Sequence, residues 1–304
     1  KGIILIGAGK PIVLCTVDWI GIANESQDVF KDSLAKAAGT TPDRVVVHTL
    51  HQHDAPICDF TAEKILKRNN MPLYCFDGTF ARRLIKDIQK FIVLSIPKAK
   101  PVTHIGLGKA LVYNVASNRR INKKDGKVGA MRGSSCTDSV LRAMPEGLID
   151  PEISLISFWN RNKPVAVLSF YATHPQSYYL TNIANPDFVG IARYFRQLAV
   201  PDALHIHFNG AGGNIAAGKY NDGSHEMRLI LAERVAEGMK KAWENTRKYP
   251  IETADIKWLR EPLLLPYNSK IAEVENNMRE KGNENYYISN FLSRYGWYER
   301  RKEG

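Results

Sequence analysis

The sequence has 304 residues, with a hydrophobic fraction of 44%, a charged fraction of 24% and a formal net charge of +11. These proportions are ordinary for a globular protein, and the absence of any stretch of about 18 apolar residues excludes a membrane-spanning helix. The positive charge favours anionic partners such as an acidic membrane surface. It is spread along the chain without the aromatic interleaving of a nucleic-acid-binding module, so we expect no nucleic-acid partner.

The first hundred residues predict a strand–helix–strand unit followed by a long helix. Two apolar runs flank a glycine-rich turn and predict a hairpin, and Gly39 is the residue expected to end the first helix. A helix between two strands favours a parallel pair, so the second hairpin strand and the strand after the helix are expected to lie side by side. The expected ranges are 3–6 and 11–17 for the hairpin strands, 25–38 and 79–96 for the helices, and a strand that begins at Val45.

The rest of the chain continues to alternate strands and helices. A polar, basic stretch that runs to Gly147 has weak periodicity and is expected to be a long loop. Asp187 is well placed to be the N-cap of the helix that follows it. The further expected elements are strands at 102–113, 153–159, 164–171, 204–208 and 255–265, helices at 188–199 and 225–246, and two polar helices or a lid at 269–304. We therefore predict an α/β fold in which mixed β-sheets are flanked by helices.

The strand that begins at Val45 ends in a cluster of histidines. His48 is expected to lie within the strand and to be structural, whereas His51 and His53 follow its end and are followed by Asp54. Strand ends are where α/β proteins place their chemistry, because a rigid sheet holds the loop beyond. Two histidines one residue apart can bind a common metal, or one can bind the metal while the other transfers a proton. The alternative is a polar strand end with solvated imidazoles.

A second strand ends in histidine and proline, at His174 and Pro175. Two strand ends of one sheet are therefore expected to converge on one metal, with Asp18, which closes the second hairpin strand, at the same sheet edge as the first histidines. Further along, a glycine-rich turn from Asn209 to Asn214 follows a strand, and its backbone amides could stabilise an oxyanion. A tight structural turn is the alternative for this last motif.

These motifs occur in an order that resembles the neutral/alkaline non-lysosomal ceramidase family, whose amidase domain has HTHSGP-like, NRS-like and AVHP-like motifs. The residues that carry the resemblance are Asp18, His51-Gln52-His53-Asp54-Ala55-Pro56, Ser117-Asn118-Arg119, Ala172-Thr173-His174-Pro175, Asp187-Phe188-Val189-Gly190 and the turn at 209–214. We expect residues 1–250 to be a ceramidase-like catalytic domain that is incomplete at both ends, with residues 251–304 as a helical, aromatic extension of it.

The resemblance implies a zinc-dependent hydrolase of N-acyl amides of lipid-like substrates. By this resemblance, His51 and His174 match the zinc ligands, His53 matches a catalytic histidine near the scissile group, and Arg119 matches an arginine that holds the substrate or the oxyanion. The predicted substrate and oxyanion contacts are Asn209, Gly212, Gly213 and Asn214. The resemblance also implies a secreted or periplasmic protein, whose export signal would lie outside a sequence that begins without methionine.

The chain departs from the family in two respects. Ala216 stands where the family has its serine nucleophile, and an alanine side chain cannot attack a carbonyl. The family's two further zinc ligands, a glutamate and a tyrosine, have no convincing counterpart before Gly304. We therefore expect cleavage of an amide or ester by metal-activated water rather than by a serine.

Two other functions stay open. A homologue that has lost the serine could bind a lipid or a glycan without catalysis. The HxHD pattern of His51, His53 and Asp54 also resembles the start of the HxHxDH motif of metallo-β-lactamases, but no further histidine follows here. Metal content and turnover of N-acyl substrates distinguish these functions from hydrolysis, because a metallo-β-lactamase-type site would hold two metal ions.

Overall fold

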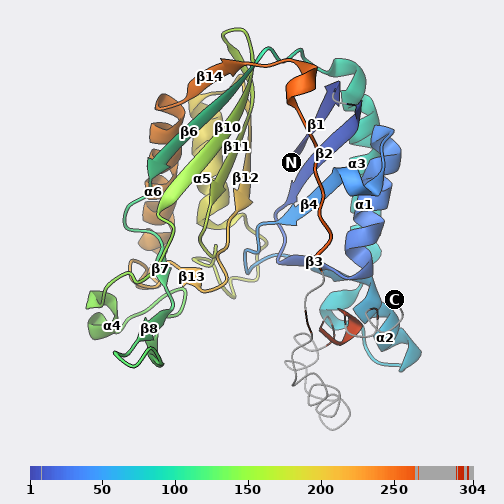
Figure 1. The fold of residues 1–304 in the computed structure, drawn as a ribbon. Helices are drawn as coiled ribbons and strands as arrows, with labels where there is room; N and C mark the ends of the chain where they lie inside the picture. The colour runs from blue at the N-terminus through green and yellow to red at the C-terminus, as the bar shows by residue number, and fades with distance from the viewer. Residues whose placement is uncertain (8, 264–265, 267–291, 293, 298–299, 301–304) are drawn as a thin grey trace.

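The computed structural model describes residues 1–7, 9–263, 266, 292, 294–297 and 300. The described residues form four layers, in which two β-sheets pack face to face and helices cover the outer face of each sheet (Figure 1). The predicted α/β fold with mixed sheets and flanking helices is thus confirmed. Among the described residues, no helix is both long and apolar enough to cross a membrane. The helices or lid expected at 269–304 lie almost entirely outside the described residues.

The N-terminal sheet and its helices are β1 (Gly2–Gly7), β2 (Gly9–Val17), β4 (Val45–Thr49), α1 (Glu25–Ala38) and α3 (Thr79–Ser95). The strand order is β1-β2-β4, with β1 antiparallel and β4 parallel to the central strand, which confirms the predicted hairpin and strand–helix–strand unit. Helices α1 and α3 pack on the outer face, where Phe30, Leu34 and Ile85 are buried. Gly39 ends α1 with φ of +66°, a left-handed conformation that glycine adopts without steric cost.

The larger sheet consists, in spatial order, of β12 (Leu204–Asn209), β11 (Lys163–Tyr171), β10 (Glu152–Asn160), β6 (His104–Leu111) and β14 (Arg247–Pro250). Strands β11 and β12 are parallel and the other neighbours are antiparallel. Helices α5 (Asp187–Ala199) and α6 (His225–Glu244) cover its outer face. On the inner face, Leu168 and Ile206 belong to a buried cluster against which Ile3, Leu5 and Leu14 of the N-terminal sheet pack.

Short elements fill the connections between these layers. They are β3 (Gly21–Ala23) paired with β5 (Ile57–Asp59), α2 (Phe60–Arg68), β7 (Ser117–Asn118) paired with β13 (Ile215–Ala216), β8 (Arg120–Asn122) paired with β9 (Val128–Met131), α4 (Ser139–Ala143), and the 3₁₀ turns Pro42–Arg44, Tyr74–Phe76, Ile96–Lys98 and Thr253–Asp255. The pairs β7–β13 and β3–β5 join segments that lie far apart in the sequence, and both lie near the ends of the larger strands (Figure 1).

Two expectations are wrong. Residues 256–263 form no strand, because β14 already occupies the sheet edge beside β6 and the chain then crosses to the N-terminal half, where the Trp258 indole donates a 2.8 Å hydrogen bond to the Asp43 carbonyl. Asp187 is not the N-cap of α5, because Pro186 takes that position and Asp187 is the first helical residue, with φ of +52°.

The stretch expected to be one long loop before Gly147 instead contains β8, β9 and α4. Its organising residue is Arg132, whose side chain is 1% exposed. The guanidinium donates hydrogen bonds of 2.7–3.3 Å to the carbonyl oxygens of Asn118, Leu141, Met144, Pro145 and Glu146. A single buried side chain therefore supplies the donors that regular secondary structure would otherwise supply.

Replacing Arg132 by alanine should lower the free energy of unfolding by about 3 kcal/mol, because several buried carbonyl groups would lose their donor. Equilibrium unfolding in urea measures this loss. Arg120→Ala removes an exposed arginine on the neighbouring strand β8 and should change the free energy by less than about 0.5 kcal/mol. A loss below about 1 kcal/mol for Arg132→Ala would contradict this role.

His207 makes stability depend on pH. It lies on β12, is fully buried, and its Nδ1 lies 2.8 Å from the Ser169 hydroxyl. Burial, and then the charge of Arg193, lower the pKa of His207 to about 3. The unfolded chain therefore binds a proton between pH 6.5 and pH 3 that the folded chain does not, and stability falls as the pH is lowered through that window.

By pH 4 this single group should cost about 3 kcal/mol of stability. Urea unfolding at pH 7 and pH 4 tests the prediction with a His207→Gln variant, whose stability should fall less between the two pH values than that of the wild type. His225→Gln, at an exposed position, should keep the wild-type difference. An identical pH dependence of all three proteins would contradict the prediction.

Candidate metal centre

His51 is fixed by the strand it follows and by Trp19 and Ile20, which lie between β2 and β3. Its backbone has φ of +61°, and its amide donates a 2.9 Å hydrogen bond to the Trp19 carbonyl. Its Nδ1 lies 2.6 Å from the carbonyl oxygen of Ile20. Because a carbonyl oxygen only accepts, Nδ1 carries the proton and Nε2 keeps its lone pair. This is the arrangement in which a backbone carbonyl orients a metal-binding imidazole.

His174 lies three residues beyond β11 and is held by β13. Its amide donates a 2.9 Å hydrogen bond to the Ile215 carbonyl, and it forms an isolated parallel bridge with Ala216. Its imidazole also has a hydrogen bond with the backbone of Gly212. The side chain is 8% exposed, so the ring is held on several sides.

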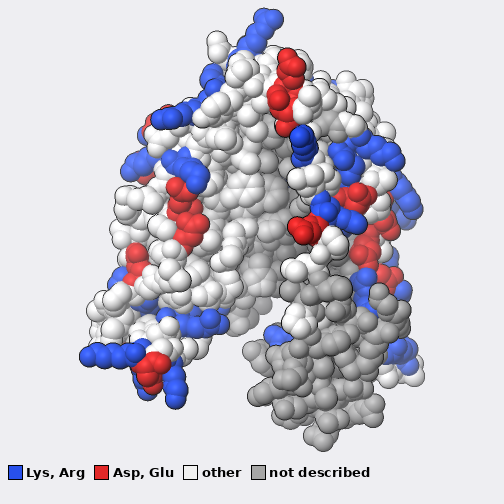
Figure 2. All heavy atoms as spheres, in the orientation of Figure 1, with Lys and Arg blue, Asp and Glu red and all other residues white. Residues whose placement is uncertain are grey.

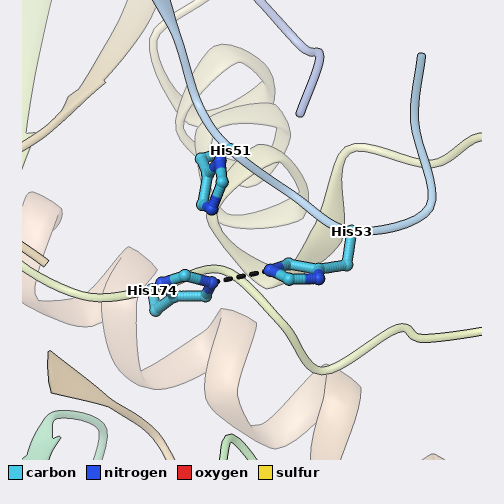
Figure 3. Close-up of side chains that lie close together, drawn as sticks. All are labelled: His51, His53 and His174. Carbon is cyan, nitrogen blue, oxygen red and sulfur yellow. Dashed lines mark hydrogen bonds between the residues drawn. The ribbon is translucent and has the colours of Figure 1, made fainter. Parts of the chain in front are cut away.

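The three imidazoles of His51, His53 and His174 converge (Figure 3). The Nε2 atoms of His53 and His174 lie 2.6 Å apart, and one nitrogen from each of the three rings lies within 4.8 Å of the others. The expectation that both strand ends belong to one sheet is wrong, because β4 and β11 belong to different sheets. Their C-terminal ends meet because the two sheets pack face to face.

Two of the three rings, those of His53 and His174, lie in a setting that keeps them neutral. The pKa of His174 is lowered to about 3, by burial first and then by the charges of Arg119 and the other two histidines. Burial, His51 and Arg119 lower the pKa of His53 to about 4. Both rings therefore keep a nitrogen lone pair at neutral pH. Nitrogen donors of this kind suit zinc, copper, iron and nickel, so the donor set fits a transition metal.

Arg119 lies between β7 and β8, beside the histidines. Its Nη2 donates hydrogen bonds to the Ser134 hydroxyl at 2.7 Å and to Gln176 Oε1 at 3.2 Å, and both partners are neutral. Its amide donates a 2.8 Å hydrogen bond to the Asn214 carbonyl, which joins it to the glycine-rich turn. Its charge acts on the histidines, because it lowers the pKa of both His53 and His174.

The glycine-rich turn packs closely against both strand ends. The Asn209 side-chain amide donates to the Leu50 carbonyl, which ties β12 to the chain just beyond β4. A Cβ on Gly212 would stand 3.0 Å from the Thr173 carbonyl carbon, so the turn approaches the His174 segment more closely than a larger residue would allow. Gly213 is exposed, with open space beside its Cα. These contacts are structural, and the roles of the turn in substrate binding stay a prediction.

Two neighbouring polar residues have structural partners. His48 lies in β4, as predicted, and its Nε2 accepts a 3.1 Å hydrogen bond from the Asn209 amide. Asp18 follows β2 at the same sheet edge as His51, but it forms a two-fold ion pair with Arg193 of α5 at 3.0 and 2.6 Å. Asp18 thus joins the N-terminal sheet to the helix layer of the other half.

A cavity of about 1340 Å³ lies around β1, between α3 and the larger sheet, and its walls are mainly aliphatic. Its lining includes Asp18 but none of the three histidines. The histidine cluster and this cavity are therefore separate features of the described part of the chain.

Comparison with known proteins identifies the fold. No protein-family model and no curated protein matches the sequence. Among solved structures, a ceramidase complexed with C2 matches 78% of this chain with a TM-score of 0.52 and 17% sequence identity. The chain has a ceramidase-like fold. The neutral ceramidase from Pseudomonas aeruginosa matches 78% of the chain with a TM-score of 0.49 and 19% identity, and the chain spans 36% and 37% of these two structures.

The ceramidase-like chain has no hydroxyl at the position where the family resemblance predicts a serine. Ala216 is fully buried in β13, and its carbonyl accepts a 2.9 Å hydrogen bond from the Ser117 hydroxyl. The Ser117 hydroxyl itself is 1% exposed and also accepts from the Lys219 amide, so it is occupied by the backbone.

Sequence reasoning missed two side chains of the candidate site, Ser134 and Gln176, which contact Arg119 and also lie 2.5 Å from each other. Gln176 follows His174 by two residues, so its place near the site could have been predicted from that distance in sequence. Ser134 lies in a stretch without clear periodicity, and no sequence pattern pointed to it.

Proposed function

We propose that this chain is the catalytic part of a zinc-dependent hydrolase that cleaves the amide bond of a lipid-like N-acyl substrate. The observation that carries the proposal is the convergence of three imidazoles on a ceramidase-like fold. Imidazole nitrogens suit zinc, and catalytic zinc sites have typically three protein ligands and one open position. The matched structure is named a ceramidase, which supports an N-acyl lipid as the substrate class.

We assign zinc binding to His51 and His174, because the backbone orients both rings. When bound, zinc lowers the pKa of a coordinated water to about 7 and polarises a carbonyl group. We assign His53 to proton transfer at the scissile group, because the family resemblance matches it to a catalytic histidine there. Arg119 would stabilise the negative charge that develops on the carbonyl oxygen.

The glycine-rich turn completes the proposed substrate site. In this proposal the backbone amides of Gly212, Gly213 and Asn214 would add donors for the developing oxyanion. We also assign Asn209, the first residue of this turn, to the proposed substrate site.

Metal analysis of the complete protein combined with a panel of N-acyl amides and esters tests the proposal. We expect one zinc per chain, with turnover that is lost on chelation and restored by zinc. Full zinc occupancy without turnover would instead favour a non-catalytic lipid- or glycan-binding homologue, which Ala216 in place of the serine supports. Two metal ions per chain would favour a metallo-β-lactamase-type site.

We also infer a secreted or periplasmic location from the family resemblance. We further infer that the protein makes peripheral contact with an acidic membrane. The β8–β9 hairpin supports the membrane contact, because Lys123, Lys124 and Lys127 are exposed on it. Elsewhere on the face in Figure 2, lysines and arginines are scattered over the outer parts rather than gathered in one patch among the coloured residues. Co-sedimentation with anionic but not zwitterionic vesicles is the expected result, and equal binding to both would contradict the electrostatic contact.

A further inference from the structure

The segment 175–186, which joins His174 to α5, has no helix or strand, yet its backbone takes unusual conformations. Leu180 has φ of +55° and Asn182 has φ of +60°, and Asp187 at its end has φ of +52°. L-residues rarely adopt this region, so the surrounding structure must hold the segment in place. Two carboxylates, Asp187 and Asp54, hold it by hydrogen bonds.

The first carboxylate is Asp187, which is fully buried. It accepts hydrogen bonds from the Ser177 amide at 3.0 and 3.1 Å, the Ser177 hydroxyl at 2.6 Å, the Tyr178 amide at 3.1 Å and the Phe188 amide at 2.7 Å. Asp187 is also the first residue of α5, where the helix dipole stabilises a negative charge. The chain that leaves His174 is thereby folded back onto the start of the helix.

The second carboxylate is Asp54, the residue directly after His53. It accepts hydrogen bonds from the Leu180 amide at 2.8 Å, the Thr181 amide at 2.9 Å and the Thr181 hydroxyl. Its own carbonyl accepts a 3.0 Å hydrogen bond from the Asn185 amide. The loop that carries His53 is thus tied to the segment that follows His174, although the two histidines are 121 residues apart in the sequence.

We propose that Asp187 and Asp54 are positioning residues, which set the separation of His53 and His174 by holding the 175–186 segment between them. Asp187 fixes the segment on the His174 side, and Asp54 fixes it on the His53 side. The inference rests on the proposed function, since it concerns residues around the proposed metal centre. Neither carboxylate is assigned as a ligand.

The chemistry of the two sites requires a carboxylate. An ionised carboxylate only accepts hydrogen bonds and can serve several donors with its two oxygens. The partners of the Asp187 and Asp54 carboxylates include backbone amides and hydroxyls, all of which donate, and the Asn185 side chain is a further partner of Asp54. Replacing either residue by asparagine keeps the size of the side chain but turns an NH₂ group toward these donors. The 175–186 segment should then move away from the substituted side chain. As a result, the separation of the His53 and His174 imidazoles should change.

Cobalt(II) titration of the complete protein tests the proposal, because the visible absorption of bound cobalt reports the arrangement of its ligands. Asp187→Asn should weaken cobalt affinity by about 10-fold or more and should alter the absorption spectrum. Asp54→Asn should do the same, because it releases Leu180 and Thr181 of the segment that follows the proposed ligand His174. Asp202→Asn, at an exposed position outside the network, should leave both unchanged. Circular dichroism establishes which variants are folded, and if Asp187→Asn does not fold, the half-exposed Asp54 decides the question.

The outcomes separate this inference from the proposed function. Folded variants with wild-type cobalt affinity and spectrum would overturn the positioning role and leave the metal centre intact, even if their melting temperatures fell. Failure of the wild-type protein to bind cobalt or zinc would overturn the metal centre, and the positioning role with it.

Discussion

Replacing His174 by alanine is expected to reduce zinc affinity by more than about 100-fold, beyond the effect typical of residues outside the ligand set. The Nε2 of His174 lies at the centre of the cluster, 2.6 Å from His53 Nε2, and its ring is neutral and nearly buried. His51→Ala should have an effect of the same size, because its Nδ1 bond to the Ile20 carbonyl leaves Nε2 for the metal. Zinc competition titrations measure both losses.

Two control variants sharpen this prediction. His225→Ala, at an exposed position on α6, should bind zinc like the wild type. His53→Ala should keep most of the zinc affinity but lose turnover, since we assign His53 to proton transfer. Loss of zinc from His53→Ala comparable to that from His174→Ala would instead make His53 the third ligand.

Replacing Arg119 by alanine is expected to lower kcat by about 10²–10³-fold while zinc stays bound, the effect typical of removing one donor to an oxyanion. Its described side-chain partners, Ser134 and Gln176, are neutral, so its positive charge is not balanced by a carboxylate among the described residues. The charge of Arg119 reaches the histidine cluster, because it lowers the pKa of His53 and of His174.

Steady-state kinetics on an N-acyl amide, together with zinc analysis, measure the effect of Arg119→Ala. The neighbouring exposed Arg120 provides the matched control, and Arg120→Ala should change kcat by less than about 2-fold, as expected for a surface substitution. A loss of zinc from Arg119→Ala would contradict a role in oxyanion stabilisation and point to support of the metal ligands instead.

The elements that the sequence predicted well are those with strong local signals. The hairpin, the helix that ends at Gly39 and the strand that ends before His51 all follow from apolar periodicity and a glycine stop. The strand expected at 255–265 failed, because alternation alone cannot tell whether a sheet edge is free, and β14 already occupies that edge. Whether a segment can pair with a strand that is distant in the sequence depends on how the rest of the chain folds, and the sequence of the segment alone does not show it.

By itself, the sequence determined that two strands end in histidines and that these ends were candidates for one metal site, because strand ends and side-chain chemistry are local features. Only the tertiary structure decided which side chains meet. The face-to-face packing of the two sheets brings β4 and β11 together, and with them His51, His53 and His174. Ser134, Asp54 and Asp187 acquired their contacts in the same way, because hydrogen bonds between distant segments exist only once the chain has folded.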